Sequence, residues 1–143
     1  MREILRRIRD SKGQSLVEFA LVVPVLCLIF MGVFDFGWIL HKQITMDNAT
    51  RAAARRGAVG EDTDTMIQLV QDSIYFPVTE DQIIVDVLGV DHTSIGDNDD
   101  RTPDNYIVVE IMLYDVELMT PLRNLVPEIY SIHLKSRAEF LIE

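Results

Sequence analysis

The sequence has few of the residues that usually build catalytic or metal sites. Its 143 residues include one cysteine, Cys27, so no disulfide can form within the chain. The three histidines, His41, His92 and His133, are far apart in the sequence, which argues against a zinc site. There is no glycine-rich phosphate loop, no cysteine pair and no Ser/His/Asp arrangement. These absences argue against an enzyme, and we expect neither catalytic residues nor a cofactor.

Basic side chains are scarce beyond the first twelve positions. The formal net charge is −10. Residues 1–12 hold five basic and two acidic side chains, a charge of +3, so the remainder carries −13 (−10 minus +3). A nucleic-acid-binding protein needs a basic face for the phosphates. The acidic body therefore excludes nucleic acid as a partner and argues against docking on an anionic membrane surface.

Charge is almost absent from residues 19–40, where Asp35 is the one ionised side chain. A helix of about 20 apolar residues, rising about 1.5 Å per residue, matches a hydrocarbon core about 30 Å thick. We therefore expect a membrane-spanning helix and not the buried helix of a soluble core. The basic residues 1–12 place the amino terminus in the cytoplasm and the carboxyl-terminal part outside. Asp35 lies within about one turn of the outer interface, where it either reaches water or has a specific partner.

The two ends of the apolar run carry residues suited to them. Glu18 stands at its start, where a carboxylate is costly and therefore suggests a function. In a helix that begins at Gln14, Glu18 lies about one turn from the terminus and favours the helix dipole. A cation for it to pair with is the α-amino group of a neighbouring subunit; the alternative is a carboxylate solvated at headgroup level. Trp38 and the pair His41-Lys42 suit the outer interface.

Gly13, followed by four residues and then Glu18-Phe19, resembles the prepilin cleavage motif of the Flp and Tad branch of type IV pilins. Segments 15–24, 32–37 and 49–58 are similar to the TadE-like family of minor pilins (pseudopilins), and residues 135–139 look like the family's closing strand. The strong part of this resemblance covers about residues 13–60. The resemblance implies cleavage between Gly13 and Gln14 by a prepilin peptidase, and assembly through Glu18 and Phe19.

The resemblance also implies a function and a set of partners. It suggests a minor pilin of a tight-adherence type IV pilus or secretion system, held in the bacterial inner membrane and supporting pilus assembly, adhesion and biofilm formation. The expected partners are the prepilin peptidase, other minor and major pilins, the inner-membrane platform and the lipid bilayer. A second interpretation is an uncleaved single-pass anchor that displays an acidic extracytoplasmic binding domain. The sequence leaves open whether the protein enters the filament or stays at its base.

The pattern of apolar residues predicts an α+β fold. We expect a leader at 1–13, a transmembrane helix at 14–42 and an extracytoplasmic α+β domain at 43–143. One long helix should span about 14–57, with Gly57 as its C-cap, and a second should start at 61–64 and end before Pro77. Strands are expected at 83–88, 106–118 and 130–142, forming a three-stranded antiparallel sheet, with a short helical turn at 120–126.

The acidic, turn-rich segment 91–105 holds the one candidate metal site. Asp97, Asp99 and Asp100 are closely spaced oxygen donors of the kind that calcium binds. The spacing does not fit an EF-hand, because Gly96 precedes the acids and no bidentate glutamate follows. A solvated loop is the favoured interpretation, and calcium remains the weaker alternative.

Overall fold

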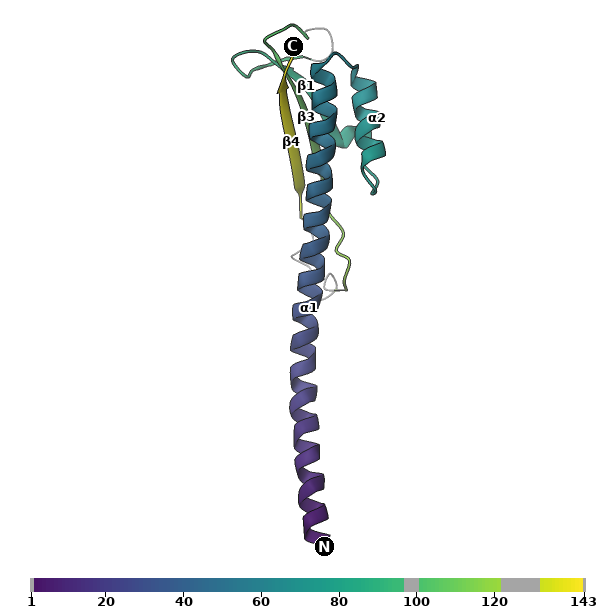
Figure 1. The fold of residues 1–143 in the computed structure, drawn as a ribbon, viewed down its shortest axis with the longest axis vertical. Coiled ribbons are helices and arrows are strands. Elements are labelled where there is room, and N and C mark those ends of the chain that lie inside the picture. The colour runs from purple at the N-terminus through teal and green to yellow at the C-terminus, as the bar shows by residue number, and fades with distance from the viewer. Residues whose placement is uncertain (1, 97–100, 122–131, 143) are drawn as a thin grey trace.

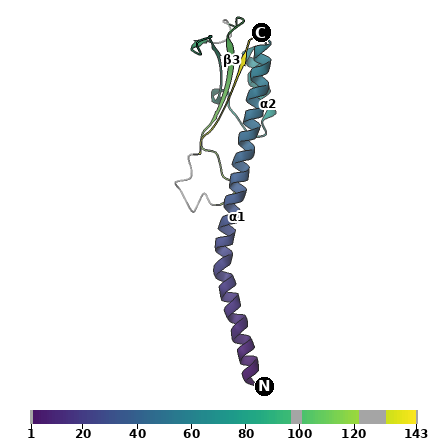
Figure 2. The same cartoon turned by 60° about the vertical axis from the view of Figure 1, so that its left-hand side comes forward.

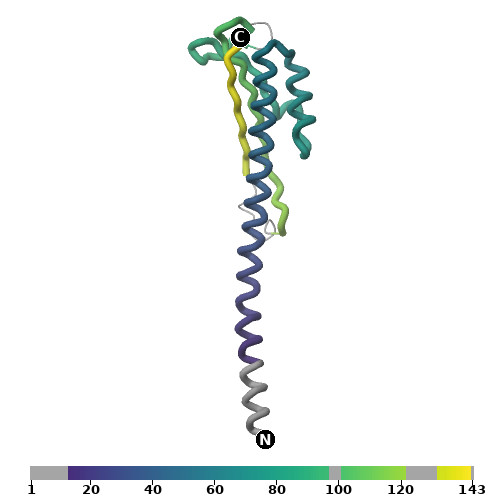
Figure 3. The backbone as a smooth tube through the Cα atoms, in the orientation of Figure 1, coloured from purple at the N-terminus to yellow at the C-terminus, as the bar shows by residue number. Residues whose placement is uncertain are grey.

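The computed structural model describes residues 2–96, 101–121 and 132–142, with side chains described from Gly13 onward (Figure 3). Helix α1 runs from Arg2 to Ala58 without a break, although Pro24 lies inside it. Helix α2 spans Thr63–Ser73, and a 3₁₀ turn, η1, spans Glu80–Gln82. The strands are β1 (Ile83–Leu88), β2 (Ser94–Gly96), β3 (Tyr106–Leu113) and β4 (Leu134–Leu141). The expected α+β class is confirmed.

The molecule is a long rod that carries a folded domain at one end (Figure 1). The carboxyl-terminal half of α1 packs on the sheet, and α2 lies alongside this half of α1 (Figure 1). The amino-terminal half of α1 extends well beyond the domain (Figure 2). One helix therefore has two environments, a packed one near Ala49 and an open one near Phe19.

The sheet is antiparallel throughout, with the strand order β2-β1-β3-β4. Strand β3 is central, and its register places Val109 opposite Val85 on one side and Ala138 on the other. These three residues therefore share the face that packs on the helices. In this order β4, the last described element along the chain, pairs with β3 in the part of the sheet that α1 covers.

Small side chains let α1 lie close to the sheet. Ala49 and Ala53 are buried together with Val109 and Ala138. Gly57 is also buried, and a Cβ atom at this position would collide with Met66 Sδ of α2 and lie 3.0 Å from Ile107 Cγ1. Gly57 is therefore the point at which α2 and the sheet approach α1 most tightly.

A buried set of hydroxyl groups fixes β4 to α1. The Ser136 hydroxyl donates to Asp47 Oδ1 at 2.5 Å and lies 3.0 Å from the Thr50 hydroxyl. Thr50 Oγ1 also donates to the Met46 carbonyl at 3.0 Å. Gln43 Nε2 donates both to Asp47 Oδ1 and to the Lys135 carbonyl, each at 3.0 Å. Because buried polar groups are costly unless bonded, this network fixes the position of β4 along the helix.

Several sequence predictions hold, and others need correction. The second helix and the first strand are confirmed by α2 and β1. The sheet has four strands and not three, because Ser94–Gly96 pairs with β1 as a short edge strand. Strand β3 ends at Leu113 and not at residue 118, and Asp115 has a φ of 55°, which extended backbone does not adopt. The predicted turn at 120–126 lies mostly outside the described residues.

The residue that caps the end of α1 also differs from the prediction. The helix ends at Ala58, as expected, but the cap is Gly60 and not Gly57. Gly60 has a φ of 99° and its amide donates to the Gly57 carbonyl at 3.1 Å. The Glu61 amide donates to the Arg56 carbonyl at 3.2 Å. This pair of bonds is a Schellman motif, which glycine favours because it has no Cβ.

Candidate assembly site on the amino-terminal helix

The four residues predicted for processing and assembly lie together near the amino-terminal end of α1. Gly13 and Gln14 are exposed within continuous helix. Gln14 Nε2 donates to Glu18 Oε1 at 3.1 Å, a bond between residues four apart on one helix face. Phe19 is 68% exposed. The site is therefore an open helix surface with one carboxylate, on the half of α1 that extends beyond the described part of the domain.

The surface that follows this site is apolar and uncovered. One helix of the described residues, Gly13–Ala58, contains a stretch that is long and apolar enough to cross a membrane, and none of that stretch is buried by the rest of the chain. The large exposed side chains between positions 16 and 40 are Leu16, Val17, Phe19, Leu21, Val22, Val25, Leu26, Leu28, Ile29, Phe30, Val33, Phe34, Phe36 and Leu40. An apolar surface of this extent requires lipid or other helices around it.

Asp35 is the exception on this surface, because it is only 4% exposed. Its Oδ1 accepts a hydrogen bond from the Thr120 amide at 2.9 Å, and its Oδ2 accepts one from the Thr120 hydroxyl. The segment after β3 descends along α1 to make this contact (Figures 1 and 3). Of the two alternatives for Asp35, the structure therefore favours a specific partner. No local sequence pattern indicates this partner, because Thr120 lies 85 positions away from Asp35.

One turn above Asp35, side chains from α1 and from the end of α2 form a cluster. Its members are Trp38, His41, Lys42, Tyr75 and Phe76, which we call the interfacial collar. The Tyr75 ring lies 5.8 Å from the Trp38 ring, edge to face, and stacks on His41 at 5.1 Å. Lys42 Nζ lies 5.7 Å from the centre of the Trp38 ring and 5.1 Å from that of Phe76. Sequence reasoning placed the three α1 residues at the outer interface but missed the two that follow α2.

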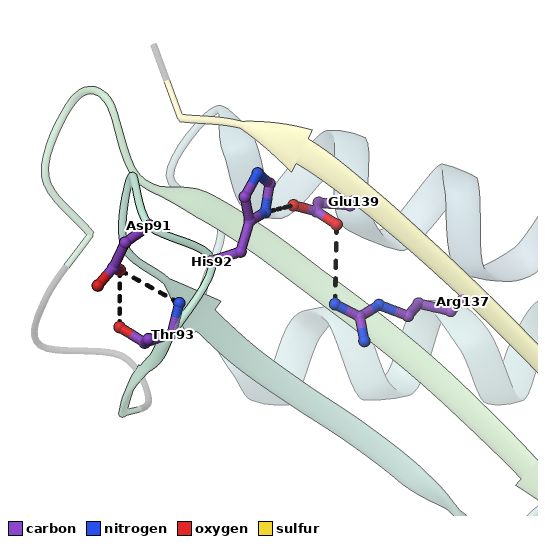
Figure 4. Close-up of polar contacts among 5 residues, drawn as sticks. All are labelled: Asp91, His92, Thr93, Arg137 and Glu139. Atoms are coloured by element: carbon purple, nitrogen blue, oxygen red, sulfur yellow. Dashed lines mark hydrogen bonds and ion pairs between the residues drawn. The ribbon is translucent and has the colours of Figure 1, made fainter.

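The candidate calcium residues Asp97, Asp99 and Asp100 lie outside the described residues. Within the part of the chain that is described, no group of three or more potential metal ligands occurs. The neighbouring Asp91 accepts hydrogen bonds from the Thr93 hydroxyl at 2.7 Å and the Thr93 amide at 3.2 Å (Figure 4). These bonds hold the pKa of the Asp91 carboxyl below its usual value. Asp91 is therefore engaged in a turn of its own loop.

The same turn is joined to the far edge of the sheet. His92 Nδ1 lies 2.8 Å from Glu139 Oε1 of β4, and Arg137 approaches the other oxygen of Glu139 at 3.7 Å (Figure 4). The His92 ring also stacks on Tyr106 of β3 at 4.9 Å. His92 thus joins the turn between β1 and β2 to strands β3 and β4.

The comparisons with known proteins find a match for part of α1 and not for the elements that follow it. Residues 13–55 match the family model of TadE-like proteins. The resemblance seen in the sequence is confirmed over this TadE-like segment. Neither the curated proteins nor the solved structures contain a match to the chain.

The TadE-like segment coincides with the features described above. It begins at Gly13, contains Glu18, the uncovered apolar surface and Asp35, and ends at Arg55 near the close of α1. Helix α2 and all four strands lie beyond it. The family match therefore covers the uncovered part of α1 together with most of the part that packs on the sheet.

Proposed function

We propose that this chain is a minor pilin of a tight-adherence type IV pilus or secretion apparatus, anchored in the bacterial inner membrane with its folded domain outside. The observation that carries the proposal is that the TadE-like segment contains the apolar stretch of α1 that the domain leaves uncovered. An uncovered apolar helix joined to a small domain suits a subunit that moves from lipid into a bundle of similar helices. In both settings its surface is covered by apolar groups.

Processing after Gly13 is the first part of the proposal. The leader is removed by the prepilin peptidase, and Gln14 becomes the new amino terminus. Helix α1 is continuous through Gly13, so the peptidase must unwind it locally to reach the peptide bond. Glycine weakens a helix interior by about 1 kcal/mol relative to alanine, which lowers the cost of this unwinding. Among the residues whose side chains are described, none outside the immediate neighbours of Gly13 lies within 4 Å of its Cβ position, so the folded domain does not cover the site.

Assembly through Glu18 is the second part. After cleavage, the α-amino group of a neighbouring subunit pairs with the Glu18 carboxylate and sets the stagger between adjacent helices. The Gln14–Glu18 bond holds the carboxylate on the helix surface before assembly. A pair of opposite charges in an apolar bundle sets the axial alignment of the helices more than it stabilises the bundle, because each charge must give up its hydration. Phe19, beside it and exposed, supplies apolar contact.

Mass spectrometry of the protein extracted from membranes tests the first part. The proposal expects a protein that lacks residues 1–13, and Gly13→Leu should leave the chain uncleaved. Gly32→Leu is the matched control, since Gly32 lies in the same helix with equally open surroundings; it should be processed normally. An intact wild-type chain would instead favour an uncleaved anchor that displays an acidic binding domain.

Copurification with other pilins tests the second part. Glu18→Gln keeps the size of the side chain and a carbonyl for Gln14 but removes the charge. We expect processing to continue while recovery of neighbouring pilins, filaments and surface adhesion falls. Asp64→Asn, an exposed carboxylate of α2, serves as the control. Normal filaments in Glu18→Gln would show that Glu18 is merely solvated at the membrane surface.

A further inference from the structure

We propose that the membrane-proximal end of the folded domain is seated in the outer interface of the lipid bilayer, through the interfacial collar and the segment that carries Met119 and Thr120. The domain would then be fixed to the membrane by three chain segments and not only by α1. This inference requires that α1 crosses a membrane, but it does not depend on the pilin role.

The axial spacing along α1 supports this placement. Glu18 and Trp38 are 20 residues apart, which is about 30 Å along a helix and equals the thickness of the hydrocarbon core. With Glu18 at the inner boundary, Trp38 reaches the outer one. Lys42 lies about 6 Å further out, at the level of the phosphates, and Asp35 lies about 4.5 Å further in. The collar and the Asp35–Thr120 contact thus straddle the outer boundary.

The chemistry of the collar suits the same level. Tryptophan and tyrosine concentrate at membrane interfaces, because each has an apolar ring and a polar tip. Tyr75 lies just after α2, and it remains 52% exposed although it contacts Trp38 and His41. The Lys42 ammonium lies over the rings of Trp38 and Phe76 and can reach lipid phosphates from there.

The segment around Thr120 has hydrogen bonds of the kind that the apolar side of the boundary requires. Backbone polar groups that enter hydrocarbon must be bonded within the protein. Thr120 directs both its amide and its hydroxyl to Asp35, so each group satisfies the other where water is scarce. The adjacent Met119 is 69% exposed and offers an apolar side chain to the surroundings.

Lipid is the occupant that the described surfaces favour. Met119 is exposed and adjoins Thr120, which contacts Asp35 inside the apolar part of α1. The large negative charge of the body keeps the rest of the domain away from anionic headgroups. A zwitterionic interface therefore fits this end of the domain, with a second protein as the competing occupant.

Trp38, the single tryptophan of the chain, reports its own depth. The full chain, reconstituted in phosphatidylcholine vesicles, would be quenched by lipids brominated at shallow, middle or deep acyl positions. We expect the strongest quenching from the shallow bromines. Strongest quenching from the deepest bromines, or none from any, would overturn the placement of the collar at the outer boundary.

Spin labels test whether the domain itself is seated. In a Cys27→Ser background, Met119→Cys and Val59→Cys each place a label at an exposed site, and Val59, at 80% exposure beyond the end of α1, is the aqueous control. At high lipid-to-protein ratio, collisions at position 119 should favour oxygen over a water-soluble nickel chelate, whereas position 59 should show the reverse. A position 119 that behaves like position 59 refutes the seating. Shielding of position 119 from both reagents would assign this surface to a second protein and also overturn the proposal.

Discussion

The contact between Asp35 and Thr120 yields a quantitative prediction. Replacing Thr120 by valine keeps the shape of the side chain but removes the hydroxyl that donates to Asp35 Oδ2, while the backbone donor remains. A hydrogen bond to a charged group contributes about 1.5–3 kcal/mol, and Asp35 is almost fully buried. The loss should therefore fall near the upper part of that range if no water replaces the hydroxyl.

Amide hydrogen exchange at position 120 measures this loss, since the Thr120 amide is the other donor to Asp35. If the segment opens locally, 1.5–3 kcal/mol corresponds to roughly a 10- to 160-fold faster exchange, after correction for the intrinsic rate of the new residue. Thr120→Ser keeps the hydroxyl and should exchange nearly as slowly as the wild type. Equal exchange in the valine and serine variants would refute the argument that Asp35 anchors this segment.

Three further predictions concern the domain. Gly57→Val should lower the free energy of unfolding by about 1–3 kcal/mol in a denaturant titration, because its side chain must displace Met66; an unchanged midpoint would contradict the tight packing. Gly60→Ala should cost about 1–2 kcal/mol, since alanine resists a φ of 99°, and an equally stable variant would contradict the cap assignment. The Thr65 hydroxyl donates to Asp62 Oδ1 at 2.5 Å and lowers the pKa of the Asp62 carboxyl. The stability that this bond contributes is therefore present above about pH 4 and is lost as the pH falls through the lowered pKa. Asp62→Asn should reduce the acid sensitivity of amide protection in α2, and an unchanged pH profile would argue against the contact.

The elements that the sequence predicted well are those with a regular apolar pattern. Helix α2 and strand β1 each show a period that one buried face imposes, and their bounds agree with prediction within a few residues. The long helix was expected over about 14–57; it ends at Ala58, close to that prediction, but it begins at Arg2. The end of α1 was predicted at the correct place but from the wrong glycine. Gly57 and Gly60 look alike in sequence, and only the approach of α2 assigns one to packing and the other to the cap.

The elements that were missed depend on contacts between distant residues. Strand β2 has three residues, all exposed, so it has no buried face that could produce a pattern. The predicted β3 was too long for a different reason, because apolar residues continue after the strand ends. Val116 is buried beyond the turn at Asp115, although the alternation of Ile107, Val109, Ile111 and Leu113 stops there. The partner of Asp35 and the two α2-end residues of the interfacial collar were unpredictable for the same reason. No local pattern marks a contact across 85 positions.

For the site itself, the sequence supplied the residues and the structure supplied their surroundings. Gly13, Gln14, Glu18 and Phe19 were identified from the motif, and the structure adds that they lie on an open helix face with one internal hydrogen bond. Their roles in cleavage and assembly stay predictions, which the mass and copurification experiments address.

The buried hydroxyl network between α1 and β4 has a consequence for biogenesis. It joins the first helix to a strand that is translated after all the other described elements, so the helix face around Thr50 lacks its β4 contacts until that strand has been synthesised. Long sequence separation makes such a contact slow to form. A chain that stalls before β4 is made would therefore leave the helix face around Met46, Ala49 and Ala53 open to chaperones and proteases, and the docking of β4 becomes the event that protects the domain.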